Sequence, residues 1–514
     1  MRAKLPLFCL IANALLACDP ATVSPAPDED APGPAEGDEG GEGGADTDDP
    51  YEGALAPVAK IDAADGPRVG EPFSLDGAGS YDPQGFEITG YAWACSDGSV
   101  REGAVASFTF VAEGPVSCAL TVTSASGLTG TASRDLSVAR PVASWTIMVF
   151  MNGDNELEGA ALEDMNELEA AGSTDAVNLM VQIDRSANYD RSDGNWTGAR
   201  RYRVERDDTM SAISSPVLMD LGTTDSGSVD SVVDFVAWAA QNYPAERYAL
   251  VLWDHGWSWS VAPTDPPYLT KGISSDYSSG NDISVAEGEL EELLDGVVGV
   301  LGQRLSIMGF DACTMAGWEI AYATMPYAEV LVGSQDYESE DGWSYDETFG
   351  DLIASPDMDA AELGERIALR FNETKDSTQS AIDLGRLTEL NAALDTLADT
   401  LMDRSDVGSL MSDAARASLD FDGGRGVDRD LGELLDNLAA GLDDDAAIAE
   451  AATARAVLDE IVLSNYTYGR AAAGATGLCI YAPTRGTVAD LYLKGSWSDG
   501  SLWDDLLVAA HGTR

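Results

Sequence analysis

Histidine is nearly absent from this chain of 514 residues, which contains only His255 and His511. A zinc site built from several histidines, including one of the HExxH type, is therefore excluded, because its ligands are missing. Basic residues are also scarce: 29 Lys and Arg stand against 89 Asp and Glu, for a formal net charge of −60. So acidic a chain repels phosphate backbones, which excludes nucleic acid as a partner. Hydrophobic residues still make up 45% of the chain, enough for a sizeable core.

No apolar run is long enough to span a bilayer as a mature helix. The apolar segment 5–17 follows Arg2 and Lys4 and ends in a small residue, as a secretory signal peptide does. Its end, Leu-Leu-Ala followed by Cys18, resembles a bacterial lipobox, in which the cysteine is lipidated and becomes the mature N-terminus. The resemblance implies an exported protein anchored by lipid to a bacterial membrane, at the outer membrane or cell surface. The alternative is an ordinary signal peptide with a chance cysteine, and a secreted product.

Residues 18–54 are dominated by Pro, Gly, Ala and acidic residues and contain no Lys or Arg. Such a segment buries too little apolar surface to offset its chain entropy, and its like charges extend it. We expect a disordered acidic tether.

Residues 55–139 consist of short alternating segments separated by Gly, Asp and Pro, which is typical of an antiparallel β-sandwich. The motifs LDGAGSYDP at 75–83, YAW at 91–93 and SDG at 96–98 resemble a PKD (polycystic-kidney-disease-type) domain, with Cys95 where that family usually has Gly. Cys95 shares strand parity with Trp93, and Cys118 with the apolar residues of its own strand, so both cysteines should face the core. Export favours a disulfide between them. The resemblance implies a spacer or weak binding module, without chemistry of its own.

Residues 144–514 change to an α/β pattern. Apolar runs at 145–151, 177–183, 248–253, 305–310 and 329–333 predict strands, and helical periodicity lies between them at 157–171, 229–241 and 285–301. This alternation predicts a mostly parallel sheet flanked by helices. The chain after about residue 355 is expected to be mainly helical until a late strand at 476–483.

Two of the predicted strands end beside rare residues. His255 follows the strand at 248–253, and Cys313 follows the strand at 305–310. Reactive groups of open α/β sheets gather at the carboxyl ends of strands. We expect a helix to start near Thr314, with its N-terminus lowering the pKa of the Cys313 thiol and His255 taking the proton. The alternative is a small buried cysteine and a solvated loop histidine, but two such residues at matching strand ends favour catalysis.

The blocks WTIMVFMNGDN at 145–155, DHG at 254–256, Gly272-Ile273, GFDAC at 309–313 and the 477–483 strand resemble a clostripain-family cysteine peptidase of the caspase, gingipain and legumain type of fold. The resemblance covers 144–514. It implies that Cys313 is the nucleophile, His255 the general base, and the N–H groups of Gly256 and Cys313 the oxyanion hole. It places Asp311 beneath a pocket for an Arg or Lys side chain of a peptide or protein substrate.

Several further assignments stay open at this stage. Asp336 and Asp341 follow the next strand and are candidates to assist substrate binding. Trp257 and Trp259 are equally suited to lining the substrate groove and to core packing, whereas Cys479 is expected in the core. Family members often depend on calcium, so a structural or activating Ca²⁺ is considered, without a nameable ligand set; the chemistry itself requires no cofactor. We expect a monomer.

Clostripain-like enzymes are commonly cut between the histidine and cysteine blocks. Between His255 and Cys313 the basic residues are Lys271 and Arg304, and a cut after Arg304 would damage the strand at 305–310. Lys271 lies in a Pro-rich segment before Gly272, which predicts self-cleavage of the Lys271–Gly272 bond.

Two other functions compete with the peptidase. One is an inactive surface-anchored binding protein that uses the PKD-like module, against which the intact candidate residues argue. The other is a serine hydrolase, but the sequence contains no Gly-x-Ser-x-Gly motif.

Overall fold

The computed structural model describes residues 50–64, 66–259, 272–371, 377–421, 427–469 and 472–513. The predicted signal peptide, Cys18, most of the tether and Lys271 lie outside the described residues. Within those ranges no helix combines the length and the apolar character that crossing a membrane requires.

The N-terminal domain is built from two antiparallel sheets. Three strands pair in the order β1-β2-β5 and four in the order β4-β3-β6-β7. Their bounds are β1 Asp62–Ala63, β2 Pro72–Asp76, β3 Ile88–Cys95, β4 Val100–Glu102, β5 Val105–Thr109, β6 Gly114–Ser124 and β7 Thr129–Val138. Alternate residues of these strands are buried, as the period of two requires.

A disulfide joins Cys95 to Cys118, the pairing expected from the sequence. The two residues are direct partners on neighbouring strands β3 and β6, so the bond links two strands of one sheet. Trp93 lies on the same side of β3 and packs edge-on against Phe108 of the opposite sheet. Together these residues form the centre of a small core.

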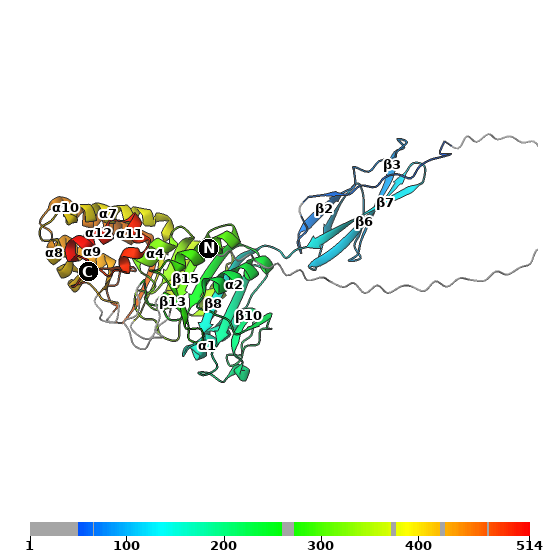
Figure 1. Cartoon of the computed structure of the whole chain (residues 1–514). Coiled ribbons are helices and arrows are strands. Elements are labelled where there is room, and N and C mark those ends of the chain that lie inside the picture. The colour runs from blue at the N-terminus through cyan, green and yellow to red at the C-terminus, as the bar shows by residue number, and fades with distance from the viewer. Residues whose placement is uncertain are drawn as a thin grey trace, which may run out of the picture. The chain divides into compact units, whose positions relative to one another are not determined.

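A nine-stranded mixed sheet organises the remainder of the described chain, in the order β11-β10-β9-β8-β12-β15-β16-β17-β19 (Figure 1). The five central strands β9, β8, β12, β15 and β16 are parallel, and the strands at both edges are antiparallel. The bounds are β8 Ala143–Gly153, β9 Val177–Arg185, β10 Gly198–Arg203, β11 Met219–Gly222, β12 Ala245–Trp253, β15 Leu305–Asp311, β16 Ala328–Gly333, β17 Ser377–Asp383 and β19 Val462–Tyr468. The predicted α/β class with its helix-flanked sheet is confirmed.

Helices cover both faces of this sheet, and strand β8 shows why. Its residues Ile147 and Val149 enter one core with helices α1, α5 and α6, whereas Met148 and Phe150 enter the other with α2 and α3. Successive side chains of a strand point to opposite faces, so a strand covered on both sides must be apolar throughout. The bounds are α1 Glu158–Ala171, α2 Val229–Asn242, α3 Glu289–Leu301, α5 Tyr345–Ala354 and α6 Ala360–Arg370.

The C-terminal part is helical, but less so than the sequence suggests. It contains α7 Leu387–Met402, α8 Val407–Ala417, α9 Leu431–Gly441, α10 Asp445–Ile461, α11 Trp497–Gly500 and α12 Trp503–His511. The prediction was wrong in missing β17 and β19, because β17 is polar in sequence (STQSAID) although six of its seven residues are buried. The late strand is β20, Cys479–Tyr481; it pairs with β18, Asp428–Asp430, in a separate small sheet.

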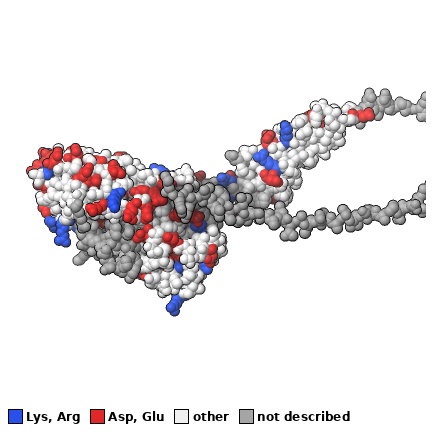
Figure 2. Space-filling model, in the orientation of Figure 1, with Lys and Arg blue, Asp and Glu red and all other residues white. Residues whose placement is uncertain are grey.

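Among the charged side chains on the face of this helical part shown in Figure 2, acidic ones cover more of the surface than basic ones. This distribution agrees with the net charge of −60.

Candidate active site

The site lies at the carboxyl ends of two neighbouring parallel strands. Trp253, the last residue of β12, is the register partner of Asp311, the last residue of β15. The backbone N–H of Asp254 donates to the carbonyl of Asp311 at 3.3 Å, which holds the two strand ends together. His255 and Cys313 each follow two residues later, so the register itself brings the two predicted catalytic residues to one edge of the sheet.

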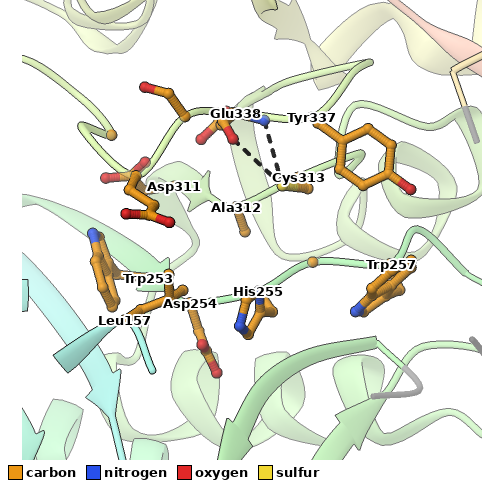
Figure 3. Close-up of a pocket in the computed structure, with 14 residues that line it drawn as sticks. Leu157, Trp253, Asp254, His255, Trp257, Asp311, Ala312, Cys313, Tyr337 and Glu338 are labelled. Atoms are coloured by element: carbon orange, nitrogen blue, oxygen red, sulfur yellow. Dashed lines mark hydrogen bonds between the residues drawn. The ribbon is translucent and has the colours of Figure 1, made fainter. Parts of the chain in front are cut away.

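His255 and Cys313 line one cavity of about 320 Å³. Figure 3 shows Asp311 toward one end of this cavity, and Trp257 and Tyr337 toward the other. The remaining lining comes from the loop after β8, from the end of β12 and the loop after it, from the turn after β15 and from the loop after β16: Leu157, Trp253, Asp254, Gly256, Ala312, Glu338, Ser339, Glu340 and Gly342. The sequence did not identify the contribution of the loop after β16 beyond Asp336 and Asp341.

Trp257 and Trp259, for which the sequence left groove lining and core packing equally open, have different roles in the structure. Trp257 lines the cavity and packs edge-on against Tyr337, with ring centroids 6.2 Å apart. Trp259 is buried and packs against Tyr481 and Tyr492, each at 4.8 Å. Trp257 therefore belongs to the groove and Trp259 to the core.

Cys313 does not begin a helix, contrary to the sequence-based expectation. The next helix, α4, spans Trp318–Thr324, and Cys313 lies in the turn before it. The adjoining Thr314 adopts a positive φ of 58°, a strained conformation of the kind that gathers at functional sites. Without a helix N-terminus at the thiol, burial dominates and raises the pKa of Cys313 to about 11, helped by the charges of Asp336 and Asp311. The backbone N–H of Glu338 donates to Sγ at 3.4 Å (Figure 3).

His255 lies beside a carboxylate that sequence reasoning missed. Its Nε2 is 3.2 Å from Oε1 of Glu156, in the loop between β8 and α1. Burial alone lowers the pKa of His255, but the hydrogen bond to Glu156 and the charges of Asp254, Glu156 and Glu340 outweigh burial and raise it. The same hydrogen bond lowers the pKa of Glu156 to about 2. The imidazole is thus held in a strongly anionic environment.

Asp254 anchors the loops around the histidine. Its Oδ1 accepts the Asn155 side-chain amide at 2.7 Å, and its Oδ2 accepts the backbone N–H of Ser275. The side chain is buried, and this burial raises its pKa to about 7. Asp254 therefore ties the loop after β8 to strand β13, which spans Gly272–Asp276.

Asp311 is buried at the end of the cavity, where Oδ2 accepts the Tyr345 hydroxyl at 2.8 Å and the Trp343 backbone N–H at 3.3 Å. A second carboxylate, Asp164 of α1, lies near it. A Cβ placed on Gly342 would come within 3.0 Å of Asp311 Oδ2 and 3.1 Å of Asp164 Oδ2. Asp164 accepts the Trp253 indole N–H at 2.6 Å, and its pKa is raised strongly by burial and by Asp311. The sequence analysis did not identify Asp164; the signal that could have found it is an acidic residue on the buried face of helix α1.

The other predicted residues are placed as follows. Asp341 is exposed and does not line the cavity, although its neighbours Glu340 and Gly342 do. The backbone carbonyl of Asp336 accepts the N–H of Thr314 at 3.0 Å and so supports the Cys313 turn. Cys479 is buried in the core, as predicted.

Gly256 packs directly against the turn that carries Cys313. A Cβ at this position would lie 2.3 Å from the carbonyl oxygen of Cys313, so only glycine fits. The N–H groups of Gly256 and Cys313 donate to no backbone carbonyl of the described residues. The assignment of these two N–H groups as oxyanion donors stays a prediction.

The expectation of a bound calcium ion is not supported by a ligand set among the described residues. Across the described ranges, no three His, Cys, Asp or Glu side chains are placed to share a metal ion. The reaction proposed for this site requires no metal ion.

Family comparisons agree with this architecture. The clostripain family model matches residues 149–507, and a PKD domain model matches residues 54–138. Clostripain of Hathewaya histolytica is 26% identical over 302 residues, which cover 50% of this chain and 56% of that protein. The chain thus spans little more than half the length of that relative.

Solved structures share the fold. An inactive zymogen C11 protease from Parabacteroides distasonis gives a TM-score of 0.52 at 20% identity, covering 72% of this chain and 99% of its own. A secreted C11 cysteine protease from Bacteroides thetaiotaomicron, solved with an irreversible peptide inhibitor, gives 0.51 at 21% identity with the same coverage. Because the family model matches well over half of its residues, the chain belongs to the clostripain family of C11 peptidases.

Proposed function

We propose that this protein is a cysteine endopeptidase that uses Cys313 as nucleophile and His255 as general base. The observation that carries the proposal is the shared cavity, in which the register of β12 and β15 places both residues beside a buried carboxylate. Nucleophile, base and a charged recognition group at one strand edge are the parts that peptide-bond cleavage requires.

The steps follow from the positions of these groups. His255 takes the thiol proton as Sγ attacks the scissile carbonyl carbon, and the N–H groups of Gly256 and Cys313 stabilise the oxyanion that forms. The imidazolium then gives its proton to the leaving amine, which leaves an acyl-enzyme on Cys313. Water, deprotonated by His255, attacks the acyl carbon and releases the second product with the free thiol.

We further propose that the side chain preceding the cut is Arg or Lys and that Asp311 binds it. A basic side chain of the substrate would form a charge-assisted hydrogen bond with this buried carboxylate, which is stronger than a bond between neutral groups. Asp164 lies next to Asp311 at this end of the cavity, and burial together with the charge of Asp311 raises its pKa strongly.

Substrate binding would also activate the nucleophile. In the free protein burial raises the pKa of Cys313, and the charges of Asp336 and Asp311 add to this effect, so the neutral thiol is favoured. A guanidinium or ammonium beside Asp311 offsets that charge and stabilises the thiolate. The basic side chain thus serves recognition and catalysis together.

Self-cleavage after Lys271 and lipidation of Cys18 belong to the same proposal. Both residues lie outside the described part of the chain, but Gly272 begins β13 and its carbonyl accepts the N–H of Trp257 at 3.0 Å. A cut before Gly272 would therefore fall beside Trp257, which lines the groove. The signal sequence supports export, and one structural relative is a secreted protease.

The variant Cys313→Ala tests the proposal, because it removes the sulfur and little volume from a turn. We expect hydrolysis of Arg and Lys peptide substrates to be lost while the circular dichroism spectrum and unfolding midpoint stay unchanged. Turnover that persists in this variant would refute the assigned nucleophile.

A further inference from the structure

We propose that Glu156 is a positioning residue for His255, which holds the imidazole with its proton on Nε2 and leaves Nδ1 to accept the proton of the Cys313 thiol. The inference rests on the dyad proposed above and adds a third residue to it. Glu156 acts through the histidine, and no contact with substrate is assigned to it.

The geometry supports a direct hydrogen bond to the ring. Oε1 of Glu156 is 3.2 Å from Nε2 of His255 and also accepts the Tyr277 hydroxyl at 3.3 Å. The histidine side chain is 23% exposed and that of Glu156 is 47% exposed. Glu156 does not line the cavity that His255 shares with Cys313, so its bond to Nε2 leaves Nδ1 for the cavity.

The backbone that carries Glu156 is fixed by its neighbours. The Asn155 side chain is fully buried and donates to Asp254 Oδ1 at 2.7 Å, to the Ser275 carbonyl at 3.1 Å and to the Asn152 carbonyl at 3.2 Å. Its own Oδ1 accepts the Leu157 N–H at 2.9 Å. These four bonds hold the residues on both sides of Glu156, so its carboxylate is delivered to the ring by a rigid turn.

Other carboxylates near the ring serve differently. Asp254 uses both oxygens on Asn155 and Ser275. Glu340 acts on His255 through its charge. Glu156 is therefore the carboxylate that can select a tautomer, because it bonds to one ring nitrogen.

The chemical consequence concerns the proton. An ionised carboxylate accepts only, so the Nε2 that faces it must carry hydrogen, and the lone pair of the neutral ring then lies on Nδ1. When Nδ1 takes the thiol proton, the imidazolium pairs with Glu156 until the leaving amine receives that proton. Around the ring, the titratable groups are Glu156, Asp254, Glu340, Tyr277 and Cys313.

Two histidines in the chain make a direct test practicable. Full-length Cys313→Ala protein labelled with ¹⁵N-histidine would be titrated by NMR, with a His511→Gln variant assigning the signals. We expect neutral His255 to show a protonated Nε2 and an unprotonated Nδ1. Adding Glu156→Gln should keep this tautomer but lower the pKa of His255, because Gln accepts the bond without charge. Glu156→Ala should remove the preference, whereas Glu292→Gln, an exposed residue of α3, should change nothing.

Kinetics on protein with Cys313 intact give the second readout. Glu156→Ala should lower kcat about tenfold or more with little change in KM, and Glu156→Gln should move the acidic limb of kcat/KM to lower pH. An Nδ1-protonated ring, or unchanged kcat, pKa and acidic limb in the Glu156 variants, would overturn the inference. Loss of activity in Cys313→Ala beside unaffected Glu156 variants would overturn only the positioning role; activity in Cys313→Ala would instead refute the dyad.

Discussion

Trp253 and Asp311 are register partners at the ends of the parallel strands β12 and β15, and each sets the position of a reactive residue two places further along. Both partners also contribute to the site: Asp311 closes one end of the cavity, and the Trp253 indole donates to Asp164 at 2.6 Å behind it. The sheet register thus brings together the proposed nucleophile, the proposed base and the proposed recognition end of the cavity.

Asp311→Asn should reduce kcat/KM for substrates with Arg or Lys before the cut by at least about tenfold, or about 1.4 kcal/mol. The amide preserves the shape and can still accept the Tyr345 hydroxyl, but it lacks the charge that binds a cation. Steady-state kinetics on matched peptides measure the loss. Tyr345→Phe is the control, since it removes the hydroxyl and leaves the carboxylate. Equal cleavage by the Asn variant and the parent would show that another group recognises the basic side chain.

Purified active protein should run as two fragments, the second beginning at Gly272. A protease that prefers basic residues can cut the Lys271–Gly272 bond, and this cut depends on Cys313. N-terminal sequencing and intact mass identify the fragments, and both Cys313→Ala and Lys271→Gln proteins should stay whole. Full activity in a single uncut chain would refute activation by cleavage while leaving the dyad in place.

Stability should fall as pH rises, partly because of Glu319. Burial raises the pKa of this residue from 4.5 to about 8, although it accepts the Tyr492 hydroxyl at 2.9 Å and the Tyr481 backbone N–H at 3.0 Å. Between those two pKa values the folded state binds more protons than the unfolded state, so the free energy of unfolding decreases with increasing pH. Glu319→Gln should flatten this slope and stabilise the protein at about pH 8 by about 1 kcal/mol or more. Urea unfolding from about pH 5 to about pH 8 measures it. A slope identical to that of the parent would mean that Glu319 is ionised in the folded state.

Removing the Cys95–Cys118 disulfide should destabilise the N-terminal domain by about 3 kcal/mol. The bond closes a loop with a sequence separation of 23, and the entropy lost by the unfolded chain grows with loop length. Hydrogen exchange of the full-length Cys95→Ser, Cys118→Ser double variant should show faster exchange in strands β3 and β6. Unchanged protection in those strands would assign their stability to the Trp93 core alone.

Much of the site could be predicted from the sequence because the strands that carry it are continuous apolar runs. Strands β8, β12 and β15 are buried on both faces, so their apolar runs, and the rare residues that follow β12 and β15, can be recognised in the sequence. Strand β17 was not predicted because its buried side chains are polar and form hydrogen bonds, so its sequence has no apolar pattern. For example, the Thr378 hydroxyl accepts the Gln335 N–H at 2.9 Å. Glu156 and Asp164 could not be predicted because each acts on a residue far away in the sequence. Glu156 bonds to His255, 99 positions away, and Asp164 to Trp253, 89 positions away.

Covalent labelling with a basic peptide inhibitor shows whether Cys313 is the nucleophile and whether it reacts in a site that recognises Arg. The full-length protein would be incubated with an irreversible peptide ketone inhibitor that carries Arg before the reactive group, and the modified residue located by peptide mass spectrometry. We expect one adduct, on Cys313, which is absent from His255→Ala protein and strongly reduced in Asp311→Asn protein. A protein that cleaves Arg and Lys substrates but leaves Cys313 unmodified, or carries the adduct on Cys479, would contradict it.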